Sequence, residues 1–415
     1  AVLMAKKNNI AIGVATKTNA LLDQLVYHEL PALAQSLGDV TYAPLKGFSH
    51  YPCLRKVNRF VKEGVKMVDV QGTEHSQAPS LGALLSFIDQ TDYDDMDSLK
   101  MDYRVVPRRA VTTTSHDCLR RKCPFYGTTC FVHGARRFAE TADVVVTNHT
   151  LLFCDAAADN GLLPPVRHWI LDEAHGAEAE ARRAFSLEIA AEDVTRLAQK
   201  VASGESRNVY ARAERKLSSS LKNDGATLFE GLIGKAKSAG DMFAAAAHEF
   251  APHIKDLLYF DPNKRSRSYD RTELWLNDDI RASETFGSLR TLAKAMQVSA
   301  EKAITCSQEL VGYLENIEGA AEPQREIASV AMDLKDLVGA VEVIFGEKSD
   351  SYAYAAELCR KKDKQTDKLE ALVVNVGEAL EDKLYSQTKS VVFASATLSI
   401  DGDFTSFENA MGLNA

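Results

Sequence analysis

Four short apolar runs, far apart in the chain, constrain its fold more than any other feature. Each is made of β-branched, small or aromatic residues, and polar residues follow where the run ends, as expected for buried strands of a parallel sheet. The predicted fold class is α/β with an open parallel sheet. The runs are IAIGVAT at 10–16, ADVVVTNH at 142–149, RHWILDEAH at 167–175 and VVFASATL at 391–398.

The third run ends in a group of chemically active side chains. Asp172 and Glu173 follow the apolar residues directly, so both carboxylates are expected at the carboxyl end of a strand, where open α/β sheets bind ligands. Asp172 is suited to hold Mg²⁺ through its water shell, and Glu173 to orient and deprotonate a water that attacks a γ-phosphate. An acidic helix start is the alternative, because Asp and Glu favour first turns.

The cysteines form a second group. The chain has seven, an odd number with uneven spacing, so metal or cluster ligation is a better first hypothesis than disulfides. Four residues separate Cys118 from Cys123, six separate Cys123 from Cys130, and 64 separate Cys53 from Cys118. This spacing favours an iron-sulfur cluster over zinc, which usually has two close pairs. Zinc and unligated thiols remain open alternatives.

Basic residues surround these cysteines, although the net charge of the chain is −9. Residues 104–137 contain eight Lys or Arg and one acid, whereas residues 63–102 contain nine acids and two Lys. Cations interleaved with aromatic rings are typical of single-stranded nucleic acid sites, and a solvated surface is the alternative. The predicted track comprises Tyr51, Arg55, Lys56, Arg120, Arg121, Lys122, Arg136 and Arg137.

Residues 181–373 have helical periodicity instead. Apolar residues at 190, 194, 197 and 201, and again at 327, 330, 334, 337 and 341, are spaced like one face of a packed helix. A mostly helical insertion is predicted, with a basic hairpin loop at 261–271. No apolar run approaches the ~18 residues of a membrane span, so a cytoplasmic protein without membrane contact is expected.

The quoted segments, taken together, resemble the DinG branch of the XPD-like superfamily 2 helicases, which carry an iron-sulfur cluster. IAIGVATKTNALLDQL resembles motif Ia, KGFSHYPCLRK the entry to the cluster domain, and DCLRRKCPFYGTTCFVHGARRFAETADVVVTNHTLLF its exit. LDEAH resembles motif II and VVFASATLS motif III. The resemblance implies an ATP-dependent helicase that moves 5′ to 3′ on single-stranded DNA and unwinds forked duplexes in repair or replication.

The resemblance also implies roles for single residues. Cys53, Cys118, Cys123 and Cys130 become the ligands of a [4Fe-4S] cluster. Thr16 and Lys17 of motif Ia are expected to contact nucleic acid, and His175 to relay the nucleotide state toward it. Ser395 and Thr397 are expected to couple ATP to DNA grip, although capping a turn is their plain alternative role.

The implied organisation is an incomplete RecA-like motor domain with two insertions. The motor parts are predicted at 1–48, 140–180 and 374–415, the cluster domain at 49–139 and the helical arch domain at 181–373. No G-x4-G-K-[ST] phosphate loop is present, and the chain stops just after motif III. A fragment is therefore expected that lacks ATPase activity alone, although the full-length protein uses ATP and Mg²⁺. A monomer is expected. Alternatives are a zinc-stabilised, non-catalytic DNA-binding module and a nuclease-linked or mobile-element relative.

Overall fold

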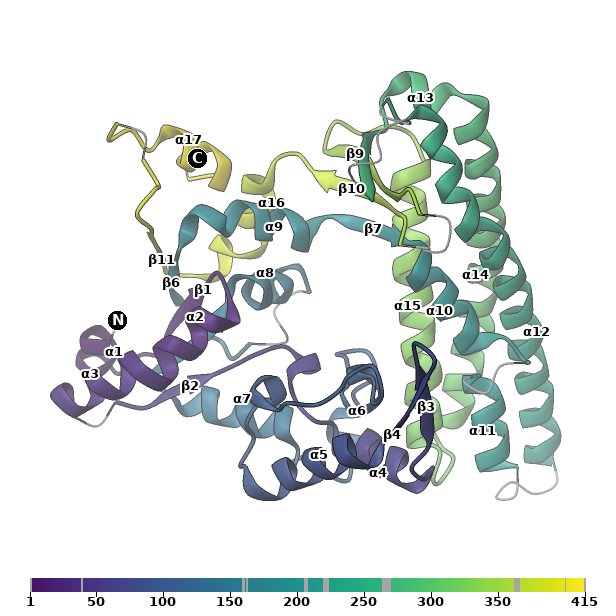
Figure 1. Ribbon diagram of the computed structural model, residues 1–415, viewed down its shortest axis with the longest axis horizontal. Coiled ribbons are helices and arrows are strands. Elements are labelled where there is room, and N and C mark those ends of the chain that lie inside the picture. Colours follow the sequence, from purple (N-terminus) through teal and green to yellow (C-terminus); the bar gives the residue numbers. More distant parts are fainter. Residues whose placement is uncertain are drawn as a thin grey trace. The chain divides into compact units, whose positions relative to one another are not determined.

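The computed structural model describes residues 2–38, 40–158, 161, 163–204, 208–218, 224–262, 270–361, 366–399 and 401–413. The chain divides into two compact units (Figure 1). The sheet unit comprises Ala1–Phe185 and Asn375–Ala415, and the helical unit is Ser186–Val374. Each unit is described by itself.

A five-stranded parallel sheet organises the sheet unit and confirms the predicted α/β class. Its strand order is β11-β6-β1-β5-β2, and every neighbouring pair is parallel. At its centre Gly13 pairs with Trp169, and a Cβ on Gly13 would lie 2.3 Å from the Trp169 ring, so only glycine fits there. The strands are β1 Ile12–Thr16, β2 Tyr42–Pro44, β5 Val144–Asn148, β6 His168–Asp172 and β11 Ser390–Ala394.

Helices cover both faces of this sheet. On one face, Val144 and Val146 pack with Leu22 and Leu30. On the other, Val145 packs in a larger core with residues of the helices that follow β5 and β6. The first face is covered by α1 Val2–Asn8, α2 Asn19–Gln24, the π-helical turn Leu25–Glu29 and α3 Leu30–Leu37; the chain then leaves the helix through Gly38 at φ +60°. The second face is covered by α8 His149–Ala157, α9 Ala177–Phe185 and α16 Val376–Lys383.

The segment between β2 and β5, which we call the cysteine lobe, has a small core of its own. Val57, Leu84, Met96, Val106 and Val111 form this core. The lobe contains the helices α4 Leu54–Lys62, α5 Ala78–Gln90, α6 Arg108–Val111 and α7 Phe131–Thr141. It also contains the antiparallel hairpin of β3 Met67–Val70 and β4 Thr73–Ser76, and the 3-10 turns Phe48–His50, Met96–Ser98 and Arg120–Lys122.

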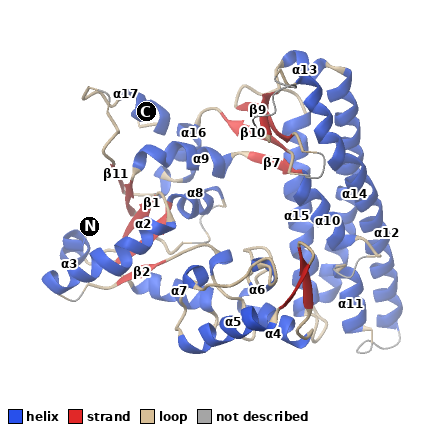
Figure 2. Cartoon of the chain, in the orientation of Figure 1, coloured by secondary structure: helices blue, strands red, loops and turns tan. Residues whose placement is uncertain are grey.

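The helical unit combines long helices with a second sheet (Figure 2). Val194 and Val201 on α10 and Ile327 and Leu334 on α15 are buried, as their periodicity predicts. The helices are α10 Ala191–Val201, α11 Val209–Leu217, α12 Asp224–His253, α13 Asp278–Ala282, α14 Glu284–Leu314 and α15 Ala321–Phe345, with the 3-10 segment Ile254–Phe260.

The second sheet is antiparallel and was not predicted. Its order is β7-β10-β9-β8, with β7 Leu187–Ala190, β8 Arg271–Trp275, β9 Tyr352–Cys359 and β10 Lys368–Val373. β7 begins the unit, β8 lies near its middle, and β9 and β10 end it, so the pairing of β7 with β10 and of β8 with β9 leaves no local sequence signal. Most of the predicted hairpin loop, residues 263–269, lies outside the described residues.

The remaining elements are the 3-10 turns Ala174–Gly176 and Tyr385–Gln387 and the helix α17 Thr405–Met411. The predicted arch boundary at residue 181 falls inside α9, and the compact helical unit begins five residues later, at Ser186. Within the described ranges, no helix combines the length and apolar character needed to cross a membrane.

Candidate nucleotide and metal sites

The carboxyl ends of three neighbouring strands bring the predicted motor residues together. β1 is followed by Lys17, β6 by Glu173 and His175, and β11 by Ser395. Lys17 Nζ lies 3.0 Å from His175 Nε2, and His175 Nδ1 lies 2.9 Å from Ser395 Oγ. The imidazole therefore links the ends of the two strands that flank β6. Parallel pairing accounts for this, because it aligns the carboxyl ends of β11, β6 and β1 along one edge.

The hydrogen bonds of His175 define its tautomer. A lysine ammonium can only donate, so Nε2 must accept from Lys17 and the ring proton lies on Nδ1. That Nδ1–H faces both Ser395 Oγ and Glu173 Oε2, the latter at 3.1 Å. Glu173 itself has a left-handed backbone with φ +53°. For a residue other than glycine this conformation costs on the order of 1 kcal/mol, and such strain is concentrated at functional sites.

Other predicted residues of this edge differ in accessibility. Asp172 is half-buried at the end of β6, and Thr397 is exposed in the turn after β11. Thr16 is fully buried, and its hydroxyl donates to the carbonyl of Thr18 at 3.0 Å. The Thr16 side chain thus stabilises the turn after β1, and the structure gives no support to its predicted contact with nucleic acid.

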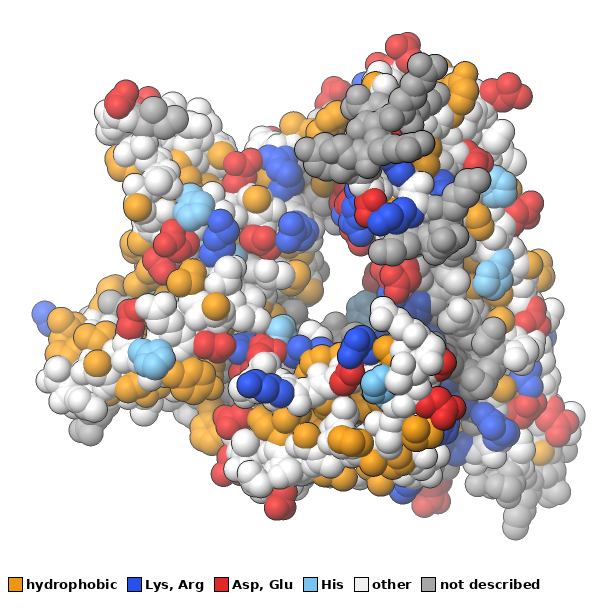
Figure 3. Space-filling model, viewed as in Figure 1, with side chains coloured by type: hydrophobic (Ala, Val, Ile, Leu, Met, Phe, Trp, Pro, Cys, Tyr) orange, Lys and Arg blue, Asp and Glu red, His pale blue; other side chains and the backbone are white. Residues whose placement is uncertain are grey.

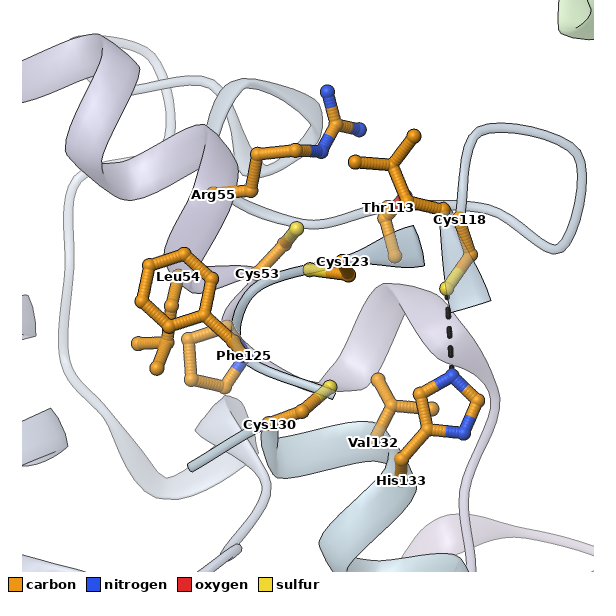
Figure 4. Close-up of a pocket in the computed structure, with 12 residues that line it drawn as sticks. Cys53, Leu54, Arg55, Thr113, Cys118, Cys123, Phe125, Cys130, Val132 and His133 are labelled. Carbon is orange, nitrogen blue, oxygen red and sulfur yellow. Dashed lines mark hydrogen bonds between the residues drawn. The ribbon is translucent and has the colours of Figure 1, made fainter. Parts of the chain in front are cut away.

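The four predicted ligand cysteines line one pocket in the cysteine lobe (Figure 4). Apolar side chains fill much of the wall, including Leu54, Leu119, Phe125 and Val132. Arg55, Thr113 and His133 supply its polar groups. The structure thus brings Cys53 together with cysteines more than sixty residues later in the chain. Cys53, Cys118, Cys123 and Cys130 are all free thiols.

Local backbone structure presents these thiols. Cys53 precedes the first residue of α4, and Cys130 precedes the first residue of α7. The Cys53 N–H donates to the Val111 carbonyl at 2.7 Å, which fixes the start of α4 against the end of α6. Between Cys118 and Cys130 the chain folds in tight turns, one of which includes Gly127 at φ +83°.

The electrostatics of the pocket favour neutral thiols unless a cation is bound. Burial raises the pKa of Cys118, and it raises the pKa of Cys130 to about 11; charge on the neighbouring cysteines adds to both shifts. Two nitrogen atoms lie near Cys118 Sγ: the Arg120 amide, which donates to it at 3.4 Å, and His133 Nε2 at 3.4 Å, which donates or accepts according to the ring tautomer. Thiolate sulfur is the ligand that soft metal ions and iron-sulfur clusters require, so the donor set fits such a group.

Among the residues that the structure describes, no three His, Cys, Asp or Glu side chains form a site ready to hold a metal ion. The cysteine pocket is thus defined by its thiols and its lining rather than by a preformed coordination geometry.

The first half of the predicted nucleic acid track is not available to a ligand. Tyr51 is 2% exposed, and its hydroxyl accepts the Lys46 N–H at 3.1 Å, so its ring cannot stack on a base. Arg55 is 9% exposed and donates to the Asp117 carbonyl at 3.1 Å. Lys56 forms an ion pair with the Asp117 carboxylate at 3.1 Å. Each of these three side chains is engaged inside the lobe, so the structure gives no support to the DNA contact predicted for them.

The second half of the track is more accessible. Arg120, Arg121, Lys122 and Arg137 are exposed. Arg136 is half-buried and donates to the Gly161 carbonyl at 2.9 Å. On the visible face of the sheet unit, basic side chains lie among acidic and apolar ones (Figure 3).

Sequence analysis overlooked an aromatic residue beside these cations. Phe138 directly follows Arg137 on α7 and is 57% exposed. Its ring centroid lies 5.7 Å from that of Tyr93, and the Arg137 guanidinium lies 5.8 Å from the same Tyr93 ring. The sequence RRF at 136–138, in which an aromatic residue directly follows two arginines, is the signal that could have identified Phe138.

Sequence analysis also missed a buried charge network where the lobe meets the sheet. The Lys46 ammonium, 1% exposed, lies 2.9 Å from Asp23, 2.9 Å from Asp95 and 3.1 Å from Asp97. Burial opposes the charge, but hydrogen bonds to Asp23 and Asp95 outweigh it and raise the pKa of Lys46. Asp97 also contacts His50 at 2.9 Å and Arg108 at 2.5 Å. Asp23 belongs to α2, whereas Asp95 and Asp97 belong to the lobe, so the network joins the lobe to α2.

An α/β domain, built on an open parallel sheet that carries polar groups at its strand ends, is thus the class that the fold defines. No protein-family model matches the chain. Among curated proteins, the 3'-5' exonuclease DinG of Bacillus subtilis is 27% identical over 430 residues, which covers 100% of this chain and 43% of that protein. The ATP-dependent helicase DinG of Mycobacterium tuberculosis is 35% identical over 219 residues, 48% of this chain and 32% of that protein.

The ATP-dependent DNA helicase YoaA of Escherichia coli is 34% identical over 210 residues, 48% of this chain and 31% of that protein. A solved structure of truncated XPD aligns with 98% of this chain over 85% of its own length, with 10% sequence identity and a TM-score of 0.36. The chain is thus similar in sequence to DNA helicases of the DinG and YoaA type. It spans less than half the length of these curated relatives.

Proposed function

We propose that the protein containing this chain is an ATP-dependent DNA helicase that moves 5′ to 3′ on single-stranded DNA. The observation that carries the proposal is the Lys17–His175–Ser395 link, which joins the ends of three adjacent strands. A change in the bound nucleotide could be transmitted through His175 to the segments that follow β1 and β11. The names of the DinG and YoaA relatives add support.

The roles of the sheet edge follow from its chemistry. ATP supplies the phosphoryl group and Mg²⁺ neutralises its charge. Asp172 would hold the Mg²⁺ through water, and Glu173 would orient the attacking water and accept its proton. In the observed arrangement the Glu173 carboxylate lies 3.1 Å from His175 Nδ1. Nucleotide binding would therefore compete with His175 for the Glu173 carboxylate. Thr397, which is exposed in the turn after Ser395, would respond to the resulting shift of His175 and Ser395.

For the cysteine pocket we propose a [4Fe-4S] cluster held by Cys53, Cys118, Cys123 and Cys130. Four thiols and an apolar wall fit that group, and metal charge would offset the cost of burying thiolates. Zinc in the same pocket is the competing ligand, and it would make the lobe a structural module.

For DNA we propose that Arg120, Arg121, Lys122 and Arg137 contact phosphates and that Phe138 stacks on a base. Each phosphate contact to a single strand adds about 0.7 to the salt slope of binding. The triple Ala variant of residues 120–122 should therefore lower the slope by about 2, and Phe138→Ala should weaken binding by on the order of 1 kcal/mol at unchanged slope. An unchanged slope in the triple variant would contradict the assignment.

The activity itself is tested by ATP hydrolysis with and without single-stranded DNA and by unwinding of forks with either a 5′ or a 3′ tail. The protein used should have the length of its curated relatives. We expect DNA-stimulated hydrolysis and unwinding from the 5′ tail; the absence of both would refute the proposal. The 415-residue chain, which has no phosphate-loop motif, should not hydrolyse ATP above background.

A nuclease-linked relative is the second candidate, because the Bacillus subtilis protein that matches the whole chain is named an exonuclease. Under this alternative the sheet unit would serve a nuclease carried by another part of the protein. Degradation of single-stranded DNA without ATP-dependent unwinding would favour it. A monomeric protein in the cytoplasm is proposed in either case.

A further inference from the structure

His133 lies among the four cysteines yet is not one of the predicted ligands. Its Nε2 lies 3.4 Å from Cys118 Sγ, the contact drawn in Figure 4. We propose that His133 is a positioning residue for the Cys118 thiolate and raises the reduction potential of the iron-sulfur cluster held by the four cysteines. This inference rests on the proposed cluster, and it concerns a residue that metal ligation alone does not require.

His133 is held in place from two sides. It lies in the first turn of α7, three residues after Cys130, and its backbone N–H also faces the Cys130 sulfur. Its ring packs edge-on against Tyr126, with 4.6 Å between centroids, and edge-on against Phe48 at 6.4 Å. One residue thus contacts two of the four sulfurs, and two aromatic rings restrict its rotation.

The chemistry of the contact determines its direction. A metal-bound thiolate has no proton, so the hydrogen bond forms only when His133 carries its proton on Nε2 and donates it to Cys118 Sγ. The Arg120 amide donates to the same sulfur at 3.4 Å. Cys118 thus has one donor from the backbone, which a side-chain substitution leaves in place, and one from a side chain, which can be removed.

Donors to a ligand sulfur stabilise the more negative state of a cluster. One-electron reduction, with dithionite as the electron donor, adds one negative charge that is shared by iron, sulfide and thiolate sulfur. An N–H directed at Cys118 Sγ stabilises this charge and so raises the potential. The electron enters and leaves without a change of ligand, and the His133 proton stays on Nε2.

The test uses anaerobically purified protein and three variants. His133→Phe keeps an aromatic ring against Tyr126 but removes the donor. His133→Gln restores an N–H donor at similar reach. His75→Phe is the matched control, because His75 lies on β4 of the same lobe and is not part of the pocket lining. The measurements are the midpoint potential, followed by electron paramagnetic resonance, and the rate at which a chelator extracts iron.

We expect a more negative potential and a weaker hold on iron, about 10- to 100-fold, in His133→Phe, with His133→Gln close to the unmodified protein and His75→Phe unchanged. A cluster whose potential is the same with His133→Phe and with His133→Gln would overturn this inference and leave the proposed cluster intact. Protein that contains zinc, or no iron and sulfide, would overturn both. If His133→Phe does not fold, His133→Ala takes its place as the variant without a donor: a potential more negative than that of His133→Gln supports the contact, and equal potentials in the two variants overturn it.

Discussion

The cysteine pocket and the sheet edge are two sites built in opposite ways. The pocket collects four thiols from separate turns and helix starts and surrounds them with apolar side chains. The sheet edge places polar side chains at adjacent strand ends, where His175 and Glu173 remain 37% and 41% exposed. The first arrangement buries four thiols that need a bound cation to ionise, whereas the second rests on the hydrogen-bonded strands of a parallel sheet. Substitutions should therefore change folding in the pocket and chemistry at the edge.

The largest effect is expected from Cys123→Ser. Binding of a structural metal contributes about 10 kcal/mol or more to the folding of a small domain, so loss of one ligand should release iron and destabilise the lobe by several kcal/mol. Limited proteolysis should then cleave within residues 49–139 and spare the helical unit Ser186–Val374. Cys306→Ser, in the helical unit, is the matched control. If the lobe resists proteolysis equally in both variants, the idea that the cysteine pocket depends on its ligand for folding is contradicted.

Glu173→Gln should affect chemistry without affecting the fold. In protein of the relatives' length, loss of the base should slow ATP turnover by about 10²- to 10⁴-fold while nucleotide affinity and thermal stability are kept. Retention of the iron content would show that the edge and the pocket are independent. Loss of stability in step with activity would contradict the idea that the sheet supports this edge by itself.

Asp97→Asn tests the network that joins the lobe to α2. Burial opposes the charge on Asp97, but hydrogen bonds from His50 and Arg108 hold its pKa below the ordinary value of 3.8. A depressed pKa stabilises the fold above the pKa of the unfolded state and is lost as pH falls through that of the folded state. At pH 7 the variant should lose about 2 kcal/mol of unfolding free energy. Denaturant titrations from pH 7 to pH 3 should show this difference constant above pH 5 and shrinking below pH 4.

Tyr51→Phe is expected to have the smallest effect and separates the core role of Tyr51 from DNA binding. The substitution leaves the Lys46 N–H without its acceptor, at a cost of about 1 kcal/mol. Affinity for single-stranded DNA should not change, because the ring is buried. A clear loss of DNA affinity at unchanged stability would mean that the lobe opens to expose Tyr51.

Much of the sheet could be predicted from local sequence. The strands β1, β5, β6 and β11 are apolar runs with polar ends, and parallel pairing then sets their polar ends side by side. That Lys17 would reach His175 was not predictable, because it depends on strand order and on the close approach of Gly176, where a Cβ would lie 3.0 Å from the Lys17 side chain.

The basic track shows where local sequence is insufficient. Arg55 and Lys56 have the same composition signal as Arg120 and Arg121, yet α4 turns the first pair toward Asp117 and leaves the second pair exposed. Long cationic side chains are buried where a partner satisfies them, and that partner lies 62 and 61 residues away. Only the folded lobe distinguishes the two pairs.

The most direct test of the difference between the two sites is the metal content of the chain. Protein purified without oxygen should contain close to four iron and four sulfide per chain if Cys53, Cys118, Cys123 and Cys130 hold a [4Fe-4S] cluster. It should show broad visible absorption that is lost together with the iron. One zinc per chain, with neither iron nor sulfide, would contradict the account.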